Sequence, residues 1–191
     1  MTSLGTYGFR GEALYAICSI GTIAVTTKTE KDNVAKMYCF DSDGTITDSK
    51  LTHQGNGTTI TVSNLFRDFP VRKQTFKTAK SQKDELKRIE DLLMSFALIY
   101  NNVRITLRNN KREVWRKNRT SSLGYSIQEL FKSKVMQELT ECNIDEEEFK
   151  IYGFIPKKDS NVQLVGRSMS DRIFIFVNKR PVVMTVIKKV V

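Results

Sequence analysis

The order of apolar and polar residues along the first third of the chain predicts strands with one short helix. Helical spacing covers 12–20, and alternating apolar and polar positions predict strands over 22–28 and 34–40. Asp43-Gly44 then supplies a hairpin turn. The β-branched residues of 58–65 fit a pleated surface and predict a further strand.

The clearest helix is predicted over 81–99. Ser81 is its expected N-cap, and Asp84 and Glu85 are favourably placed in the first turn. The apolar residues that recur there at helical spacing are Leu86, Ile89, Leu93, Phe96 and Ala97.

A strand over 103–108 follows that helix, and Asn109-Asn110 turns the chain into a partner strand over 112–117. Apolar residues alternate with arginine and threonine in the first of these strands, so the hairpin should present one strongly basic face.

The polar segment from Asn118 to Ser122 is the best candidate for a linker. Ser126 and Glu129 then match a capping box at the start of a new helix, which bears Ile127, Leu130, Phe131, Val135 and Leu139. Strands over 150–155 and 172–178 follow, and a helix begins near Val186. This mixture of hairpins and helices favours the α+β class, with two domains that meet near residue 120.

Composition adds a charge pattern to this outline. The 191 residues carry a net charge of +10, and residues 67–119 alone hold 15 basic and 6 acidic side chains, a balance of +9. The surplus indicates a polyanionic partner such as nucleic acid. An acidic run over 138–148 is interpreted as a solvated face. No apolar run approaches the roughly 20 residues of a membrane span, and one histidine with three scattered cysteines disfavours a zinc site or a disulfide framework.

Two motifs are candidates for the functional site. In Gly8-Phe9-Arg10-Gly11-Glu12-Ala13-Leu14, two glycines open a helix, so backbone N–H groups can approach a phosphate. The alternative is a glycine turn that only caps the helix.

The second motif is Asp41-Ser42-Asp43-Gly44-Thr45, which looks like the nucleophile loop of haloacid-dehalogenase-type phosphatases. Asp41 would attack phosphorus and Asp43 would act as general acid and base, with Mg²⁺ on the phosphate. The downstream acidic pair that this class needs is not evident, and a plain hairpin turn is the competing interpretation.

The first motif resembles the GFRGEAL signature of the MutL family of DNA mismatch-repair proteins. Two later segments also resemble that family, in the expected order. They are Gly57-Thr58-Thr59-Ile60-Thr61-Val62 with Leu65-Phe66 and Pro70-Val71-Arg72-Lys73, and Phe176-Val177-Asn178-Lys179-Arg180-Pro181-Val182. The stretch around 91–96 is most similar to the eukaryotic post-meiotic-segregation type.

The resemblance implies a partial GHKL-type ATPase α/β sandwich over 1–119 and a partial ribosomal-S5-like transducer domain over 120–191. It implies ATP and Mg²⁺ as cofactors, a MutL-homologue partner subunit, mismatch-recognition proteins as further partners, and a nuclear location. Thr58 and Thr59 are expected near the adenine. The residues expected around the triphosphate are Gly8, Phe9, Arg10, Gly11, Glu12, Ala13 and Leu14.

The sequence also departs from the family pattern. The motifs that carry the water-activating glutamate, the magnesium-binding asparagine and the adenine-reading aspartate are absent from these 191 residues. We therefore expect a fragment of the N-terminal region that does not hydrolyse ATP on its own, and that exposes apolar sheet surface.

Double-stranded DNA is the expected polyanion. Basic stripes bind phosphates without reading bases, so binding should depend on salt and tolerate any sequence. A fragment that only binds DNA or a protein partner remains the alternative. The residues expected to contact DNA are Arg72, Lys73, Lys77, Lys80, Lys179 and Arg180.

Overall fold

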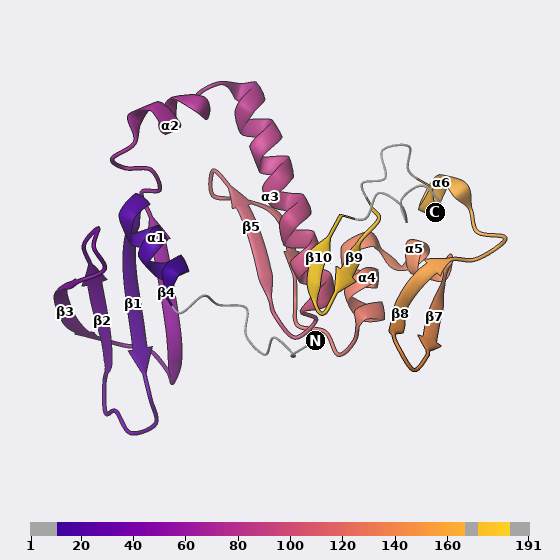
Figure 1. The fold of residues 1–191 in the computed structure, drawn as a ribbon, viewed down its shortest axis with the longest axis horizontal. Coiled ribbons are helices and arrows are strands. Elements are labelled where there is room, and N and C mark those ends of the chain that lie inside the picture. The colour runs from indigo at the N-terminus through magenta and orange to yellow at the C-terminus, as the bar shows by residue number, and fades with distance from the viewer. Residues whose placement is uncertain (1–10, 167–171, 184–191) are drawn as a thin grey trace. The chain divides into compact units, whose positions relative to one another are not determined.

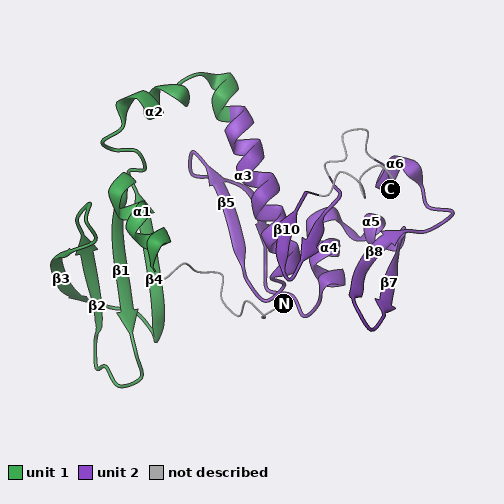
Figure 2. Cartoon of the chain, viewed as in Figure 1, with its two compact units in different colours: residues 1–82 green, residues 83–191 purple. Residues whose placement is uncertain are grey.

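The computed structural model describes residues 11–166 and 172–183. Its helices and antiparallel strands confirm the α+β class (Figure 1). Contacts divide the chain into two compact units, unit 1 with residues 1–82 and unit 2 with residues 83–191 (Figure 2). This boundary falls inside a long helix and reflects packing alone, so the domain boundary expected between residues 119 and 120 stays a prediction.

Unit 1 is built on a four-stranded antiparallel sheet in the order β3-β2-β1-β4. The helix predicted over 12–20 and the strand predicted over 22–28 begin and end at the predicted residues, whereas the six-residue α2 was not predicted. Pro70 at its first position is the signal that could have found it, because proline suits the first turn of a helix. The elements are α1 (Glu12–Ile20), β1 (Thr22–Lys28), β2 (Ala35–Phe40), β3 (Ile46–Thr52), β4 (Gly57–Ser63) and α2 (Pro70–Thr75).

One face of this sheet is only partly covered. Alternation along β1 and β4 places Ile23, Ile60 and Val62 on the same face. Ile23 and Cys18 of α1 are buried, and α1 packs against β1. Ile60 and Val62 remain 48% and 43% exposed, so the expected exposure of apolar sheet surface is present.

Unit 2 combines the long helix α3 with three two-stranded antiparallel sheets, β5–β6, β7–β8 and β9–β10. Its buried apolar residues come from α3, β5 and α4, and they are Ala97, Leu98, Leu107 and Ile127. The elements are α3 (Ala79–Ile99, which begins in unit 1), β5 (Ile105–Asn109), β6 (Arg112–Lys117), α4 (Leu123–Phe131), α5 (Ser133–Gln137), β7 (Leu139–Asp145), β8 (Lys150–Pro156), α6 (Val162–Val165), β9 (Ile175–Val177) and β10 (Arg180–Val182).

Both predicted helix caps were wrong by a few residues. Thr78 caps α3, since its Oγ1 accepts the backbone N–H of Ser81 at 3.2 Å. Ser122 caps α4 by accepting the N–H of Tyr125 at 3.4 Å. Ser126 is instead buried inside the helix. In each case the helix begins earlier than predicted, and an earlier hydroxyl residue accepts one of its free first-turn N–H groups.

Two further predictions in unit 2 were wrong. The β5–β6 turn uses Asn110 and Lys111, whose φ values of 47° and 67° give the left-handed pair that a two-residue hairpin needs. The helix predicted to carry Val135 and Leu139 breaks at Lys132, where φ is 72°. The acidic run then forms β7 and the turn after it. The helix predicted near Val186 lies outside the described residues.

Candidate functional site

The start of α1 is a helix N-terminus without a side-chain cap. Gly11 is the N-cap, in the left-handed conformation with φ 87° and ψ −7°, and no side chain caps the helix. Its carbonyl accepts the N–H of Tyr15 at 3.1 Å, which begins the helix. The N–H groups of Glu12, Ala13 and Leu14 have no acceptor within the described ranges. Such free N–H groups at a helix N-terminus favour a phosphate.

Space in front of this turn is open. A Cβ on Gly11 would meet no heavy atom within 4 Å, so the glycine is required by its backbone angle and not by crowding. Gly8, Phe9 and Arg10, the other residues expected around the triphosphate, lie outside the described residues.

Glu12 does not have the surroundings of a catalytic base. Its side chain is exposed, and no hydrogen bond or ion pair with another described residue orients it. A general base has to be held within reach of the proton that it abstracts. The carboxylate at the first turn instead interacts favourably with the helix dipole.

Thr58 and Thr59 of β4 lie on opposite faces of the sheet because they are consecutive in a strand. Thr58 Oγ1 lies 2.9 Å from Thr27 Oγ1 on β1, whereas Thr59 is opposite Thr26. Only one of the two side chains can therefore face a given adenine. Their expected role in nucleotide binding stays a prediction.

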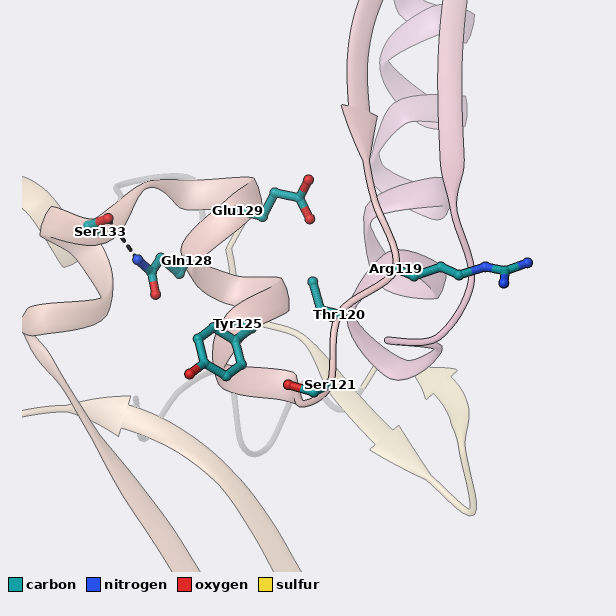
Figure 3. Close-up of a pocket in the computed structure, with 7 residues that line it drawn as sticks. All are labelled: Arg119, Thr120, Ser121, Tyr125, Gln128, Glu129 and Ser133. Atoms are coloured by element: carbon teal, nitrogen blue, oxygen red, sulfur yellow. Dashed lines mark hydrogen bonds between the residues drawn. The ribbon is translucent and has the colours of Figure 1, made fainter.

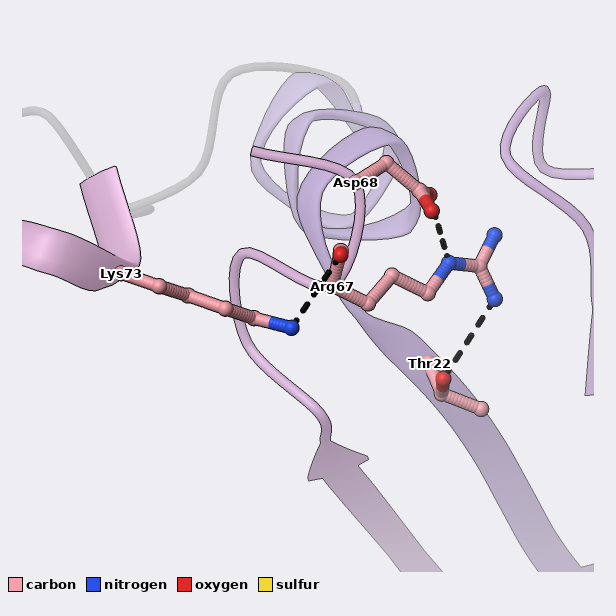
Figure 4. A network of polar contacts seen from close by, with 4 residues as sticks. All are labelled: Thr22, Arg67, Asp68 and Lys73. Carbon is pink, nitrogen blue, oxygen red and sulfur yellow. Dashed lines mark hydrogen bonds and ion pairs between the residues drawn. The ribbon is translucent and has the colours of Figure 1, made fainter. Parts of the chain in front are cut away.

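The loop between β4 and α2 is held by its own basic residues (Figure 4). Arg67 pairs with Asp68 at 2.8 Å, and its guanidinium reaches Thr22 Oγ1 on β1 at 3.5 Å. Lys73 Nζ donates to the Arg67 carbonyl at 3.1 Å. The guanidinium of Arg72 lies 5.5 Å from the centre of the Phe66 ring. Two of the residues expected to contact DNA, Arg72 and Lys73, thus also order this loop.

Lys77 and Lys80 differ from these two residues. Both side chains are exposed, and neither makes a hydrogen bond or ion pair with any other described residue. Lys179 is likewise exposed at the β9–β10 turn, while Arg180 begins β10 and has a contact within the protein. The ammonium groups of Lys77 and Lys80 are therefore available to phosphates.

A buried cation lies where β6 ends, and sequence reasoning did not find it. Lys117 is fully buried, and its Nζ donates to the carbonyls of Tyr100, Asn101 and Val103 at 3.0, 2.5 and 3.1 Å. Burial lowers the pKa of its ammonium, and the Glu129 carboxylate opposes this shift. Its position opposite Ile105, on the apolar side of the hairpin, follows from the observed strand register, which the predicted turn at Asn109-Asn110 did not give.

The segment expected to be a linker is tied into the same network. Thr120 donates its backbone N–H to the Asn101 carbonyl at 2.8 Å, and its hydroxyl lies 2.6 Å from Ser126 Oγ. Glu129 accepts hydrogen bonds from the backbone and side-chain amides of Asn118 at 2.9 and 2.7 Å. The connection from β6 to α4 is therefore firmly hydrogen-bonded.

An open pocket of about 600 Å³ lies beside this connection (Figure 3). Figure 3 shows the Arg119 side chain directed away from the side chains of α4. No residue predicted to bind nucleotide or DNA lines the pocket, and its open, polar walls favour no particular ligand. The lining residues are Arg119, Thr120, Ser121, Tyr125, Gln128, Glu129 and Ser133.

The phosphatase interpretation is not favoured. Asp41 Oδ1 accepts the backbone N–H groups of Asp43 and Thr45 at 3.0 and 2.8 Å, so this carboxylate holds the β2–β3 loop. Gly44 takes the left-handed conformation that the loop needs. Within the described residues, no group of three or more possible metal ligands occurs. None of the described helices is both long and apolar enough to cross a membrane.

Comparison with known proteins shows that this chain is similar to DNA mismatch repair proteins. Residues 127–191 match the family described as DNA mismatch repair protein, C-terminal domain. The human protein named PMS1 protein homolog 1 is 42% identical over 184 residues, which cover 95% of this chain and 20% of the human protein. The chain thus spans about a fifth of the length of this curated relative.

Two solved structures share the fold. The first is a crystal structure of the N-terminal domain of a DNA repair protein, which is 28% identical to this chain. The match has a TM-score of 0.76 and covers 95% of this chain and 57% of the solved chain. The second is the Aquifex aeolicus MutL ATPase domain complexed with ADP, which is 21% identical with a TM-score of 0.70, over 94% of this chain and 66% of that one.

Proposed function

Because this chain belongs to the MutL-homologue family of DNA mismatch repair proteins, we propose that it binds an adenine nucleotide at the start of α1 and duplex DNA through its basic surface. Its fold is that of MutL ATPase domains. This fold is the basis on which we propose both nucleotide binding and DNA binding. The observation that carries the proposal is the open N-terminus of α1, capped by a glycine in the left-handed conformation.

Nucleotide binding is supported by three features of α1. The first-turn N–H groups have no described acceptor, the glycine leaves the approach open, and the helix dipole favours a negative charge there. The related structure of the MutL ATPase domain was solved with ADP. A magnesium ion would accompany the triphosphate by family analogy, although no group of ligands for it is present among the described residues.

We do not expect this chain to turn over ATP on its own. Glu12 is the carboxylate at the start of α1, and it is exposed and unoriented. Positioned groups supply most of the rate in phosphoryl transfer. Phosphate release that exceeds a protein-free blank and disappears in Gly11→Ala would refute this expectation.

Duplex binding is supported by the exposed ammonium groups of Lys77 and Lys80, which have no described partner. Such groups release counterions when they neutralise phosphates, so affinity should fall steeply with salt and depend little on sequence. Arg72 and Lys73 would contribute less, because their side chains also order the loop before α2.

The test is a titration of a fluorescently labelled duplex at several salt concentrations. We expect Lys77→Gln with Lys80→Gln to weaken binding and to reduce the salt slope by about 2, since each lysine that neutralises a phosphate adds about one unit to the slope. Lys31→Gln is the matched control, since Lys31 is also an exposed lysine of unit 1 without a described partner. An unchanged slope in the double variant would remove these lysines from the DNA surface.

The remaining partners are proposed from the family. They are a second MutL-homologue subunit and mismatch-recognition proteins, with the nucleus as the site of action. Co-purification of a tagged chain with such a subunit, together with microscopy of a fluorescent fusion, tests them.

A further inference from the structure

Three backbone carbonyls just after α3 surround a single cation that comes from another element. The helix ends at Ile99, and no basic residue lies in its last turn. The carbonyls of Tyr100, Asn101 and Val103 all accept hydrogen bonds from Lys117 Nζ. The negative end of the helix dipole lies at this terminus, where a cation is favourable. β6 therefore supplies the positive charge that the end of α3 lacks.

The ammonium of Lys117 is held by neutral oxygens and not by a carboxylate. Its distances to the three carbonyl oxygens are 3.0, 2.5 and 3.1 Å, and no described carboxylate forms a salt bridge with it. Glu129 acts on it only electrostatically, while its oxygen accepts hydrogen bonds from Asn118. Lys117 is fully buried, so the carbonyls take the place of water around the charge. Backbone carbonyls replace the hydration shell of potassium in ion channels in the same way.

The geometry of these three oxygens favours a large monovalent cation. The distances of 3.0 and 3.1 Å exceed the roughly 2.3–2.6 Å of calcium–oxygen bonds and the roughly 2.0–2.1 Å of magnesium–oxygen bonds. Divalent ions also take carboxylate ligands, and none of the three ligands here is a carboxylate. A potassium ion accepts neutral carbonyl ligands, and a free ammonium ion can donate the same three hydrogen bonds as Lys117.

We propose that the carbonyls of Tyr100, Asn101 and Val103 form a binding site for a large monovalent cation, and that the ammonium of Lys117 fills it as a cation supplied by the chain itself. The covalent tether gives this ammonium a high effective concentration at the site. The wild-type chain is therefore independent of dissolved potassium. When the ammonium alone is removed, the same oxygens bind potassium or free ammonium from solution.

Urea denaturation of Lys117→Met in different chloride salts tests this proposal, with Trp115 fluorescence as the signal. Methionine keeps most of the aliphatic stem, so only the place of the ammonium is vacated. At equal ionic strength, potassium or ammonium chloride should raise the midpoint by about 0.5 M relative to choline chloride, the shift expected at about five times the dissociation constant. Choline is too large for a site that holds one ammonium. Lys111→Met, which removes an exposed lysine of the same hairpin, should have one midpoint in all three salts.

The wild-type chain supplies a second test, which does not depend on the folding of a variant. Its midpoint should be the same in the three salts, because its own ammonium fills the site. A ¹⁵N NMR spectrum of the lysine side chains should show an ammonium group whose protons exchange slowly with water, since burial and three carbonyls protect Lys117. Equal midpoints of Lys117→Met in the three salts, a wild-type midpoint that potassium raises as much, or the absence of a protected ammonium would overturn the proposal.

Discussion

Replacing Lys117 by Met tests whether a buried ammonium holds the connection between β6 and α4. Methionine keeps most of the aliphatic stem and removes the three hydrogen bonds to the carbonyls of Tyr100, Asn101 and Val103. The three carbonyls are not affected equally. The Tyr100 oxygen keeps the Val103 N–H at 3.0 Å, and the Asn101 oxygen keeps the Thr120 N–H at 2.8 Å.

The Val103 carbonyl has no other donor among the described residues, so it alone is left without a hydrogen bond. An unsatisfied buried carbonyl costs about 1–3 kcal/mol. Removal of one bond at each of the other two carbonyls adds to this, while relief of the ammonium's desolvation offsets part of it. We expect the free energy of unfolding to fall by about 2 kcal/mol.

The assay is urea denaturation followed by the fluorescence of Trp115, the single tryptophan. Trp115 lies two residues before Lys117 in β6, opposite Leu107, so its signal reports on this part of unit 2. With a slope of about 2 kcal/mol per molar urea, the midpoint should fall by about 1 M.

Lys111→Met is the matched control, because Lys111 is exposed in the β5–β6 turn and has no described partner. It should change stability by less than about 0.5 kcal/mol. If Lys117→Met and Lys111→Met gave the same midpoint, the buried ammonium would not stabilise the connection and the reasoning would be wrong.

Three other predictions follow from local contacts. Burial lowers the pKa of Lys117 in the folded state, so the folded state releases this proton at a lower pH than the unfolded state does. The free energy of unfolding of the wild-type chain, relative to that of Lys117→Met, should therefore increase as pH rises from the lowered pKa toward 10.5. Paired urea titrations of the two chains across that pH range measure the difference. Ser122→Ala removes the cap of α4 and should lower the free energy of unfolding by about 1 kcal/mol, again by urea titration. Asp41→Asn keeps an oxygen acceptor for the β2–β3 loop and should leave the thermal midpoint within about 2 °C of wild type, whereas Asp41→Ala should lower it further, as calorimetry will determine.

The elements whose periodicity is local could be predicted from the sequence. The strands over 22–28 and 112–117 match the structure. The first carries Ile23 and Val25 among threonines, and the second was predicted as the partner of the strand before it, in which apolar residues alternate with arginine and threonine. Caps were less predictable, since Thr78 and Ser81 both bear hydroxyls and only the backbone path decides between them. The break at Lys132 depends on a positive φ that a non-glycine residue rarely adopts.

Only part of the candidate site could be predicted from the sequence. The glycine motif before α1 indicated a helix N-terminus with space for an anion, and Gly11 has that geometry. The separation of Thr58 from Thr59 follows from strand alternation and could have been foreseen. The burial of Lys117 could not have been foreseen, because the carbonyls that surround its ammonium come from the turn after α3, 14–17 residues earlier in the chain.

Equilibrium titration of the chain with a fluorescent ATP analogue in the presence of Mg²⁺ tests the central claim most directly. A side chain at φ 87° costs about 1–2 kcal/mol or shifts the backbone, so Gly11→Ala should weaken nucleotide binding about tenfold or more. Gly55→Ala should leave binding unchanged, because Gly55 has no left-handed φ and a Cβ there meets nothing within 4 Å. Saturable binding by the wild-type chain that weakens in Gly11→Ala alone is the expected result. Absent binding, or equal binding by both variants, would contradict a nucleotide site at α1.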